Sequence, residues 1–393
     1  MIVLSGADLA LPDRLMGPAT LLIDNGRIVD IVEGERHGGG RDVFFDLRGA
    51  LIAPGFIDVH VHGVEGYDTL AQPDAVREIA RRLPKYGVTA FCPTTIACDP
   101  AALRGVLSAI RDARSAPAEA SARVLAAHLE SNFISPEFAG AQPIRCLRRA
   151  VPSPLDGAYT GADILHEIDA ARPDVGIVTV APELDGGLDL VSRLVRDGHR
   201  VSIGHTGATY EQAVAAIECG ARQATHLFNR MTPLLHRAPG VVGAVLESDE
   251  VAAELVCDGV HVHPGAMRSA IAAKGAPRMM AITDGTAGSG LPAGTRSTLG
   301  GRPITVGDVA RLEDGTIAGS VLTMDRAFER LVAVVGLTPV DAAVMCSTTP
   351  ARELGLQGHG VIAEGAVADL AVLDRHCCVL QTWVGGTLVF QRD

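Results

Sequence analysis

The chain has 393 residues, of which 47% are hydrophobic, enough to bury a large core and to form one large domain plus a smaller one. Its formal net charge of −12 argues against a nucleic-acid or anionic-membrane partner, although a local basic cluster can still hold one anionic group. The eight cysteines include no Cys-x-x-Cys pair, the first residues lack a basic signal segment, and no apolar run approaches the roughly 18 residues of a membrane span. We therefore expect a soluble cytoplasmic protein with free thiols.

The two ends of the chain have the same pattern of short strands and tight turns. Residues 19–32 predict a hairpin around Asn25-Gly26, a dipeptide favoured in type I′ turns. Residues 368–390 repeat this pattern, with Gly385-Gly386 as the expected turn. Neither end is long enough for a domain of its own, so we predict that residues 1–53 and 355–393 pair into one small β-sandwich domain.

The middle of the chain, residues 54–354, alternates β-branched runs with helical segments rich in alanine and arginine. Eight candidate strands are found, at residues 56–61, 88–94, 123–130, 175–181, 200–205, 221–226, 253–258 and 279–284. Eight strands separated by helices predict an α/β fold, a parallel (β/α)8 TIM-like barrel. Catalytic groups in that fold lie at the carboxyl ends of the strands.

The carboxyl ends of the predicted strands carry residues that bind metals. In the run "PGFIDVHVHG", His60 and His62 share one side of an extended strand, because alternate side chains point to the same face. Strands three, five, six and eight end at further such residues, namely Glu130, His205, His226 and Asp284. A single one could equally be a core histidine or a helix cap, but six at one end of separate strands predict a shared site.

Histidine and carboxylate ligands suit zinc, iron or manganese, and a catalytic site keeps one position for water or substrate. A divalent cation makes hydroxide available near neutral pH and polarises a carbonyl group. An ionised Asp284 beside that water can take its proton and return it to a leaving amine. The pattern therefore predicts metal-assisted hydrolysis.

Motifs along almost the whole chain resemble those of one known family. They are "APGFIDVHVHG", "HLES" followed by "GAQ", "APE", "SIGHTGAT", "THLFNRMTPLLHRAPGVVGA", "DGVHVHP", "ITDG" and "AGSVLTMD". With these, the sequence resembles the N-acetylglucosamine-6-phosphate deacetylases of the amidohydrolase superfamily. The resemblance implies a hydrolase that converts N-acetylglucosamine 6-phosphate to glucosamine 6-phosphate and acetate, and that forms a homodimer.

The resemblance also implies roles for individual residues. Glu130, His205 and His226 match the primary metal ligands, and Asp284 matches the catalytic acid/base at the metal. The positions of His60 and His62 hold a second metal in some members and are replaced in others. We therefore expect one or two divalent ions, with zinc as the first choice and iron or manganese as alternatives.

Substrate contacts carry over by the same resemblance. Asn229 and the backbone beside it match sugar contacts, while Arg237 and His261 match a phosphate clamp, with His261 supplied by the other subunit. Arginine suits a bidentate grip on phosphate, and histidine can add a charge-assisted hydrogen bond.

Three positions depart from the family pattern. Ser131-Asn132 stand where the family has Gly-Pro, and Gln142 stands where it has a histidine that stabilises the oxyanion of the acetyl carbonyl. A glutamine can donate a hydrogen bond but carries no charge, and each lost oxyanion contact costs about 3 kcal/mol. Arg230 stands where a small residue is common and adds charge beside the sugar contacts. These changes leave open a different N-acyl amino sugar, or another amide, as the substrate.

Three other functions share part of this pattern. Ring-opening amidohydrolases commonly need a carboxylated lysine after strand four, but this chain has "TVAPEL" there, and its two lysines, Lys85 and Lys274, fall in predicted helices. Nucleobase deaminases share the His-x-His pair and the strand-eight aspartate but give no reason for the cluster around Arg237. A catalytically decayed barrel used as a binding protein is the non-enzymatic alternative, although decay usually removes ligands and none is missing.

Overall fold

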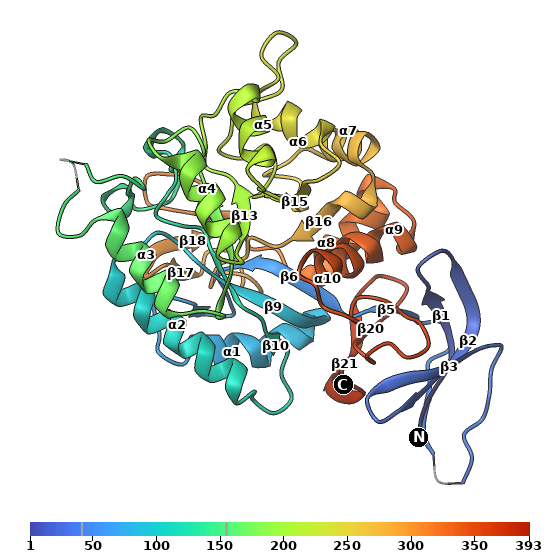
Figure 1. Cartoon of the computed structure of the whole chain (residues 1–393). Helices are drawn as coiled ribbons and strands as arrows, with labels where there is room; N and C mark the ends of the chain where they lie inside the picture. The colour runs from blue at the N-terminus through green and yellow to red at the C-terminus, as the bar shows by residue number, and fades with distance from the viewer. Residues whose placement is uncertain (41, 154–155) are drawn as a thin grey trace.

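The computed structural model describes residues 1–40, 42–153 and 156–393, which form a parallel barrel beside a smaller β-sheet (Figure 1). The barrel strands are β6 (Phe56–Val61), β9 (Val88–Thr95), β10 (Arg123–Val124), β11 (Ala127–Leu129), β12 (Val175–Val180), β13 (Arg200–Ile203), β14 (Gln223–Ala224), β15 (Ala252–Val256) and β16 (Met279–Ile282). The short β10 and β11 are two parts of the predicted third strand. The eight predicted barrel strands are therefore all present.

The strands pair in parallel in chain order, from β6 through β9 and onward to β16. The barrel closes between its last and first strands, where Asp284 N donates to His60 O over 2.9 Å. Asp58 strengthens this seam, because its carboxylate accepts from the Thr283 hydroxyl over 2.6 Å. The predicted TIM-like barrel is confirmed.

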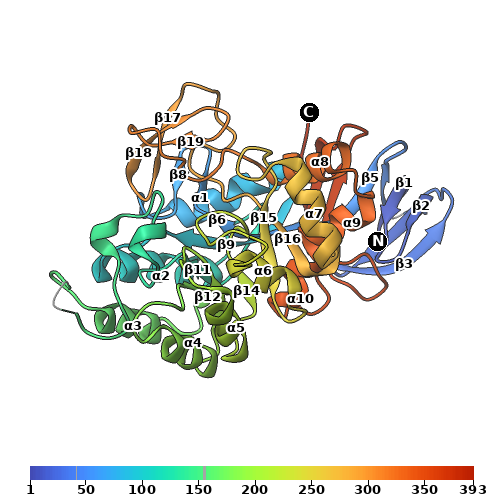
Figure 2. The same ribbon diagram turned by 90° about the horizontal axis from the view of Figure 1, so that it is seen from above.

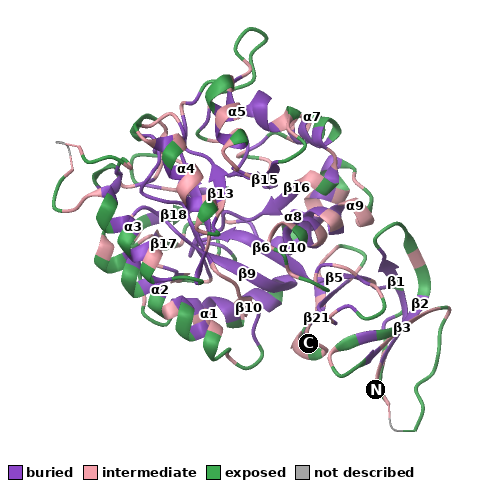
Figure 3. Cartoon of the chain, in the orientation of Figure 1, coloured by how far each residue is buried: buried purple, intermediate pink, exposed green. Residues whose placement is uncertain are grey.

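Helices cover the outside of the barrel: α1 (Ala75–Arg82), α2 (Pro100–Ser115), α3 (Gly161–Ala170), α4 (Gly187–Arg196), α5 (Tyr210–Glu218), α6 (Gly240–Glu247), α7 (Pro264–Lys274), α8 (Met324–Arg330), α9 (Pro339–Ala343) and α10 (Thr349–Glu353). Helix α2 shows how the sequence builds them. Asp99 caps its first turn by accepting from Ala102 N, and Leu103, Val106 and Ile110 recur at helical spacing and are buried. Buried and exposed faces separate in this way around the ring of helices (Figure 3). No described helix has both the length and the apolar character needed to cross a membrane.

The smaller sheet combines both ends of the chain, as predicted. Its strands are β1 (Ile2–Ala10), β2 (Leu15–Asp24), β3 (Arg27–Glu33), β4 (Val43–Asp46), β5 (Leu51–Pro54), β20 (Leu370–Leu373), β21 (Val379–Val384) and β22 (Thr387–Gln391). They form one mixed sheet in the order β22-β21-β20-β5-β1-β2-β3, with β4 beside β1. Both predicted turns are present, and Asn25 adopts the left-handed conformation with φ 47°. The exact domain limits, 1–53, 54–354 and 355–393, stay a prediction.

A three-stranded antiparallel insert was not predicted. It consists of β17 (Arg296–Leu299), β18 (Arg302–Val306) and β19 (Ala310–Arg311), and it stands at one end of the barrel beside the short hairpin of β7 (Gly63–Val64) and β8 (Tyr67–Asp68) (Figure 2). Leu299 and Ile304 pack with Ile96 of the barrel into a small separate core. The insert brings an apolar wall to the mouth of the barrel.

Candidate metal centre and active site

Three of the predicted ligands leave their strands in the same way. His205, His226 and Asp284 each lie two residues past the end of β13, β14 and β16. Each has a left-handed backbone, with φ values of 48°, 30° and 48°. Such a conformation costs a non-glycine residue about 1 to 3 kcal/mol and is concentrated at functional sites. The repeated strained turn aims all three side chains into one cavity.

Glu130, directly after β11, lies at the centre of this group. Its Oε1 is 2.8 Å from His205 Nε2 and 2.9 Å from His226 Nε2. The two histidine Nε2 atoms are 3.0 Å apart. Nitrogen and oxygen donors that converge so closely form a group able to hold one metal ion.

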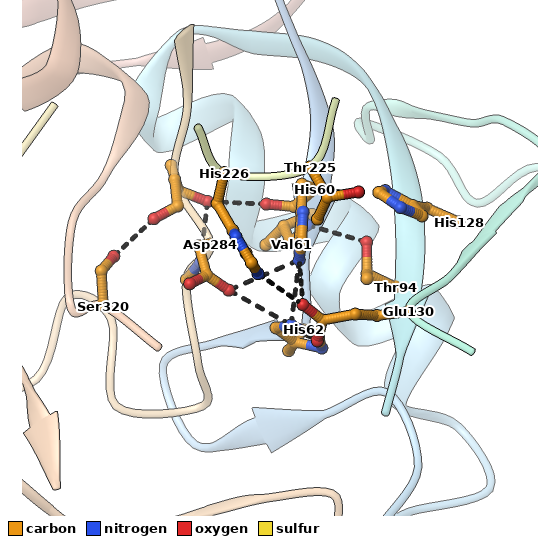
Figure 4. A network of polar contacts seen from close by, with 12 residues as sticks. His60, Val61, His62, Thr94, His128, Glu130, Thr225, His226, Asp284 and Ser320 are labelled. Atoms are coloured by element: carbon orange, nitrogen blue, oxygen red, sulfur yellow. Dashed lines mark hydrogen bonds and ion pairs between the residues drawn. The ribbon is translucent and has the colours of Figure 1, made fainter. Parts of the chain in front are cut away.

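His60 and His62 complete a second group around the same glutamate (Figure 4). Their Nε2 atoms are 3.2 Å apart, and His62 Nε2 lies 3.5 Å from Glu130 Oε2. Asp284 Oδ1 faces both, at 3.5 Å from His60 Nε2 and 3.2 Å from His62 Nε2. The structure therefore brings all six predicted metal residues together, with Glu130 shared by two ligand groups.

The charges in this cluster stabilise one another. Burial raises the pKa of the Glu130 carboxyl, but the charge and hydrogen bond of His205 outweigh burial and hold that pKa well below its usual range. Burial likewise opposes ionisation of Asp284, yet a hydrogen bond from His62 lowers its pKa. Both groups are therefore carboxylates. Burial lowers the pKa of His60, but the charges of Glu254, Asp284 and Glu130 raise it to about 10.

Glu254, which the sequence analysis missed, orients His60 from below the site. It projects from β15, is fully buried, and its Oε2 accepts from His60 Nδ1 over 2.8 Å. This contact directs His60 Nε2 toward Glu130 and Asp284, as carboxylates behind metal-binding histidines commonly do. The signal in the sequence was a single acid within the buried strand "AAELV".

His128 lies close to this cluster but is engaged elsewhere. Its Nδ1 is 2.9 Å from Val59 O and its Nε2 is 2.9 Å from Thr179 Oγ1. Burial lowers the pKa of His128 to about 4. With both nitrogens occupied and the ring neutral, His128 is a structural residue of the barrel interior.

A cavity of about 460 Å³ opens above the six residues. Its lining includes the predicted substrate residues Gln142, Asn229, Arg230 and His261, together with Leu299 of the insert. Gln142 is buried, donates from Nε2 to Glu130 Oε2, and accepts from Ala97 N over 2.8 Å. Gln142 therefore holds the Glu130 carboxylate in place as well as lining the cavity. The sequence did not suggest this contact.

The phosphate clamp suggested by the sequence is divided in the structure. His261 lines the cavity of its own chain, and its Nδ1 lies 2.6 Å from the buried Asp258 carboxylate, which fixes the ring. This position differs from the expectation that a partner subunit supplies His261. Arg237 is not among the described lining residues and lies exposed at the tip of a tight turn, where Leu235 and Ala238 exchange backbone hydrogen bonds. The loop that carries it projects between α5 and α6 (Figure 1).

Ser131 and Asn132, which also differ from the family pattern, have structural roles. Ser131 Oγ donates to Thr179 O, and Asn132 Nδ2 donates over 2.7 Å to the carbonyls of both Cys98 and Cys146. These bonds fix the loops after β9 and β11, and neither residue is among those described as lining the cavity. The change from Gly-Pro therefore stabilises the loop that presents Gln142.

Both lysines are engaged away from the metal residues. Lys274 Nζ donates to Val245 O and Ser248 O over 2.6 and 2.7 Å, and Lys85 Nζ lies 2.5 Å from Glu65 Oε1. A bridging carboxylated lysine at the metal centre is thus excluded by position as well as by sequence.

Comparison with known proteins agrees with this site. The model of a family described as "Amidohydrolase family" matches residues 51–389. The chain belongs to the amidohydrolase family. The family match and the converging histidines and carboxylates together identify the protein as a hydrolase that acts on carbon–nitrogen bonds.

Amidohydrolases similar to this chain include several amino sugar phosphate deacetylases. An N-acetylgalactosamine-6-phosphate deacetylase of Escherichia coli O157:H7 is 36% identical over 343 residues, which is 86% of this chain and 87% of that protein. An N-acetylglucosamine-6-phosphate deacetylase of Lysinibacillus sphaericus is 34% identical over 374 residues, covering 94% and 92%. The predicted family is therefore confirmed.

Solved amidohydrolase structures match the whole chain. An N-acetyl-D-glucosamine-6-phosphate deacetylase variant of Mycobacterium smegmatis, in complex with N-acetyl-D-glucosamine-6-phosphate, superimposes with a TM-score of 0.89 at 33% identity and covers 99% of each chain. A deacetylase of Thermotoga maritima gives a TM-score of 0.85 at 32% identity, covering 99% of this chain and 100% of that one. The barrel and the chain-end sheet are thus both shared with these proteins.

Proposed function

We propose that this amidohydrolase removes the acetyl group from an N-acetylated hexosamine 6-phosphate, with N-acetylglucosamine 6-phosphate as the first candidate. The convergence of Glu130, His205, His226 and Asp284 at the floor of one cavity carries this proposal. The names of the similar deacetylases supply the substrate class. N-acetylgalactosamine 6-phosphate is the second candidate, because one similar protein is named for that epimer.

The residues fit one or two divalent metal ions. Two pairs of histidine nitrogens face each other in the site. The Nε2 atoms of His205 and His226 are 3.0 Å apart, and those of His60 and His62 are 3.2 Å apart. The lone pairs of two nitrogens at this distance repel each other unless a proton or a cation lies between them. The Glu130 carboxylate belongs to the ligand group of each pair and adds negative charge that favours a cation. Zinc suits this set of ligands first, and iron and manganese also bind imidazole and carboxylate. A bound cation would polarise the acetyl carbonyl and favour ionisation of the attacking water.

The side chains around the cavity divide the remaining work. Asp284, an anion at the barrel seam, takes the proton of the attacking water and delivers it to the leaving amine. Gln142 holds Glu130 with one amide hydrogen and keeps the other for the oxygen of the acetyl group. Asn229 and His261 orient the sugar phosphate, since both line the cavity and His261 is fixed by Asp258.

A substrate panel tests the assignment. Metal-loaded protein is offered N-acetylglucosamine 6-phosphate, N-acetylgalactosamine 6-phosphate, both unphosphorylated sugars and an N-acetyl amino acid, and free amine and acetate are measured. We expect turnover of at least one phosphosugar. Absence of amine from every phosphosugar would contradict the proposed function. A protein that also rejects zinc, iron and manganese would support the decayed binding barrel instead.

We further propose that the protein acts as a homodimer in the cytoplasm. The loop that carries Arg237 exposes the large apolar side chains Leu234 and Leu235, at 54% and 55%, which a second copy would cover. Because this loop projects from its own subunit, we propose that in the dimer Arg237 completes the phosphate site of the other subunit. All eight cysteines are free thiols, which suits a reducing compartment.

A further inference from the structure

Arg230 places an unpaired cation at the edge of the cavity. Its side chain lines the cavity together with Asn229 and His261, and the residue is exposed. Among the described residues it has no hydrogen-bond or ion-pair partner for its guanidinium group. Most arginines around this barrel are paired with carboxylates or carbonyls, as Arg302 is with Ala141 O. Arg230 is therefore a cation whose partner is not supplied by the protein.

The backbone fixes where this side chain begins. Arg230 has a left-handed φ of 50°, and its carbonyl accepts from Thr206 N over 3.0 Å. Thr206 directly follows the metal residue His205, so the position of Arg230 is tied to the metal centre. A strained, non-glycine residue held in this way is typical of a functional site.

The path of the side chain depends on Gly140, which lines the same cavity. A Cβ atom added to Gly140 would lie 2.8 Å from Arg230 Nε and 3.3 Å from its Cδ. The guanidinium end therefore passes directly over the backbone of Gly140, two residues before Gln142. The absence of a side chain at Gly140 leaves room for the Arg230 guanidinium against the cavity wall. A side chain at position 140 would displace the guanidinium.

Side chains of both charge signs line the cavity. Glu130 and Asp284 line the cavity beside the histidines, and the exposed Glu137 adds a third carboxylate near Gly140. His261 lines the same cavity, with its Nδ1 facing Asp258 and with no hydrogen-bond partner for its Nε2 among the described residues. A guanidinium group presents two parallel N–H donors that match two oxygens of a phosphate. Arg230 therefore brings a cation without a protein partner among the described residues to this cavity, in a chain of net charge −12.

We propose that Arg230 binds the phosphate of the amino sugar phosphate from the same subunit that holds the metal. The inference rests on the proposed function and adds a residue that selects phosphorylated over unphosphorylated substrates. Each subunit thus supplies its own phosphate donor, in addition to any that a partner contributes.

Arg230→Ala tests the proposal when kinetics are compared on N-acetylglucosamine 6-phosphate and N-acetylglucosamine. We expect KM for the phosphosugar to rise roughly 10- to 100-fold, the loss expected for a hydrogen bond to a charged group. We expect kcat to change little, and kcat/KM for the unphosphorylated sugar to stay within about 3-fold. Arg230→Lys should recover part of the loss because it keeps the charge. Arg196→Ala, an exposed arginine on α4, controls for the change in net charge.

Gly140→Ala tests the predicted path of the side chain. The added methyl group should displace the guanidinium and raise KM for the phosphosugar, with no effect on N-acetylglucosamine. In a protein that already carries Arg230→Ala, the same change should add nothing, because no side chain remains to be displaced. Thermal unfolding of each variant shows whether the strain at φ 59° has affected folding. A Gly140→Ala effect of equal size in both backgrounds would contradict the predicted path.

Binding measurements separate this inference from the proposed function. Glucose 6-phosphate and glucose, neither of which has an amide to cleave, are titrated into the metal-loaded protein. Binding of glucose 6-phosphate that Arg230→Ala weakens supports the inference even if no substrate is turned over. Equal binding by both proteins, or equal KM changes on phosphorylated and unphosphorylated sugars, would overturn it. Failure of all phosphosugars to react would overturn the proposed function alone.

Discussion

The two ends of the cavity are built on different principles. At the metal end, Glu130 and Asp284 are 4% and 7% exposed, His60 is fully buried, and each side chain is held by its neighbours. At the substrate end, Arg230 and Arg237 are exposed and lie on the segment that follows β14. The metal end is fixed by the barrel, whereas the substrate end is formed by loops that can change without disturbing the barrel. Reaction type and substrate choice can therefore change separately.

Removal of the metal should have the largest effect on the rate of deacetylation, because all the candidate ligands lie at the metal end of the cavity, where the bound ion would favour ionisation of the attacking water. Dialysis against a chelator should reduce deacetylation to background, and zinc, iron or manganese should restore it. Glu130→Gln should behave in the same way without recovery, since Glu130 is shared by both ligand groups. Rates and metal content measured together provide the check. Full activity of a verified metal-free protein would contradict a metal-dependent reaction.

Asp284→Asn should have the next largest effect. The amide cannot accept the proton of the attacking water, so kcat should fall by roughly 100- to 10,000-fold. KM should change less, because Asp284 lies at the barrel seam and not among the basic residues of the substrate end. Steady-state kinetics with metal analysis separate lost proton transfer from lost metal. A variant with full metal and unchanged kcat would remove Asp284 from the mechanism.

The same contrast explains what the sequence could predict. The barrel and the convergence of the six candidate metal residues were predictable, because hydrophobic strands that end in His, Glu or Asp are local patterns, and the carboxyl ends of parallel strands meet at one mouth. Glu254 was missed because its role depends on a contact with His60, 194 positions away. The insert of β17 to β19 was missed because its strands are only four, five and two residues long, which leaves too few positions for a clear apolar pattern.

The substrate end was predicted less well for a physical reason. The direction in which a loop projects depends on tertiary packing, and the residue types within it do not specify that direction. His261 and Arg237 were therefore both recognised as phosphate-binding types, but their places were not. The structure puts His261 in the cavity of its own chain and Arg237 on an exposed turn.

Glu254→Gln tests whether metal binding at the metal end depends on residues that contact the ligands from behind. Glutamine keeps the shape but loses the charge that orients His60 through its Nδ1 hydrogen bond. Metal affinity or activity should fall roughly 10- to 100-fold, the usual range for such supporting residues. Metal titration and kinetics are compared with Glu218→Gln, an exposed glutamate on α5. Unchanged metal affinity and kcat would mean that Glu254 only stabilises the barrel interior.

Arg237→Ala should have the smallest effect, because Arg237 lies on a projecting turn and, unlike Arg230, is not among the described residues that line the cavity. We expect KM for the phosphosugar to rise less than about 10-fold, with kcat preserved. If the partner subunit's Arg237 acts in this cavity, mixing Arg237→Ala with Asp284→Asn subunits should restore a low KM. In the hybrid dimer, the cavity that keeps Asp284 receives Arg237 from the other subunit. No recovery in verified hybrid dimers would show that Arg237 does not act across the interface, and that phosphate binding depends on Arg230 and His261 within each subunit.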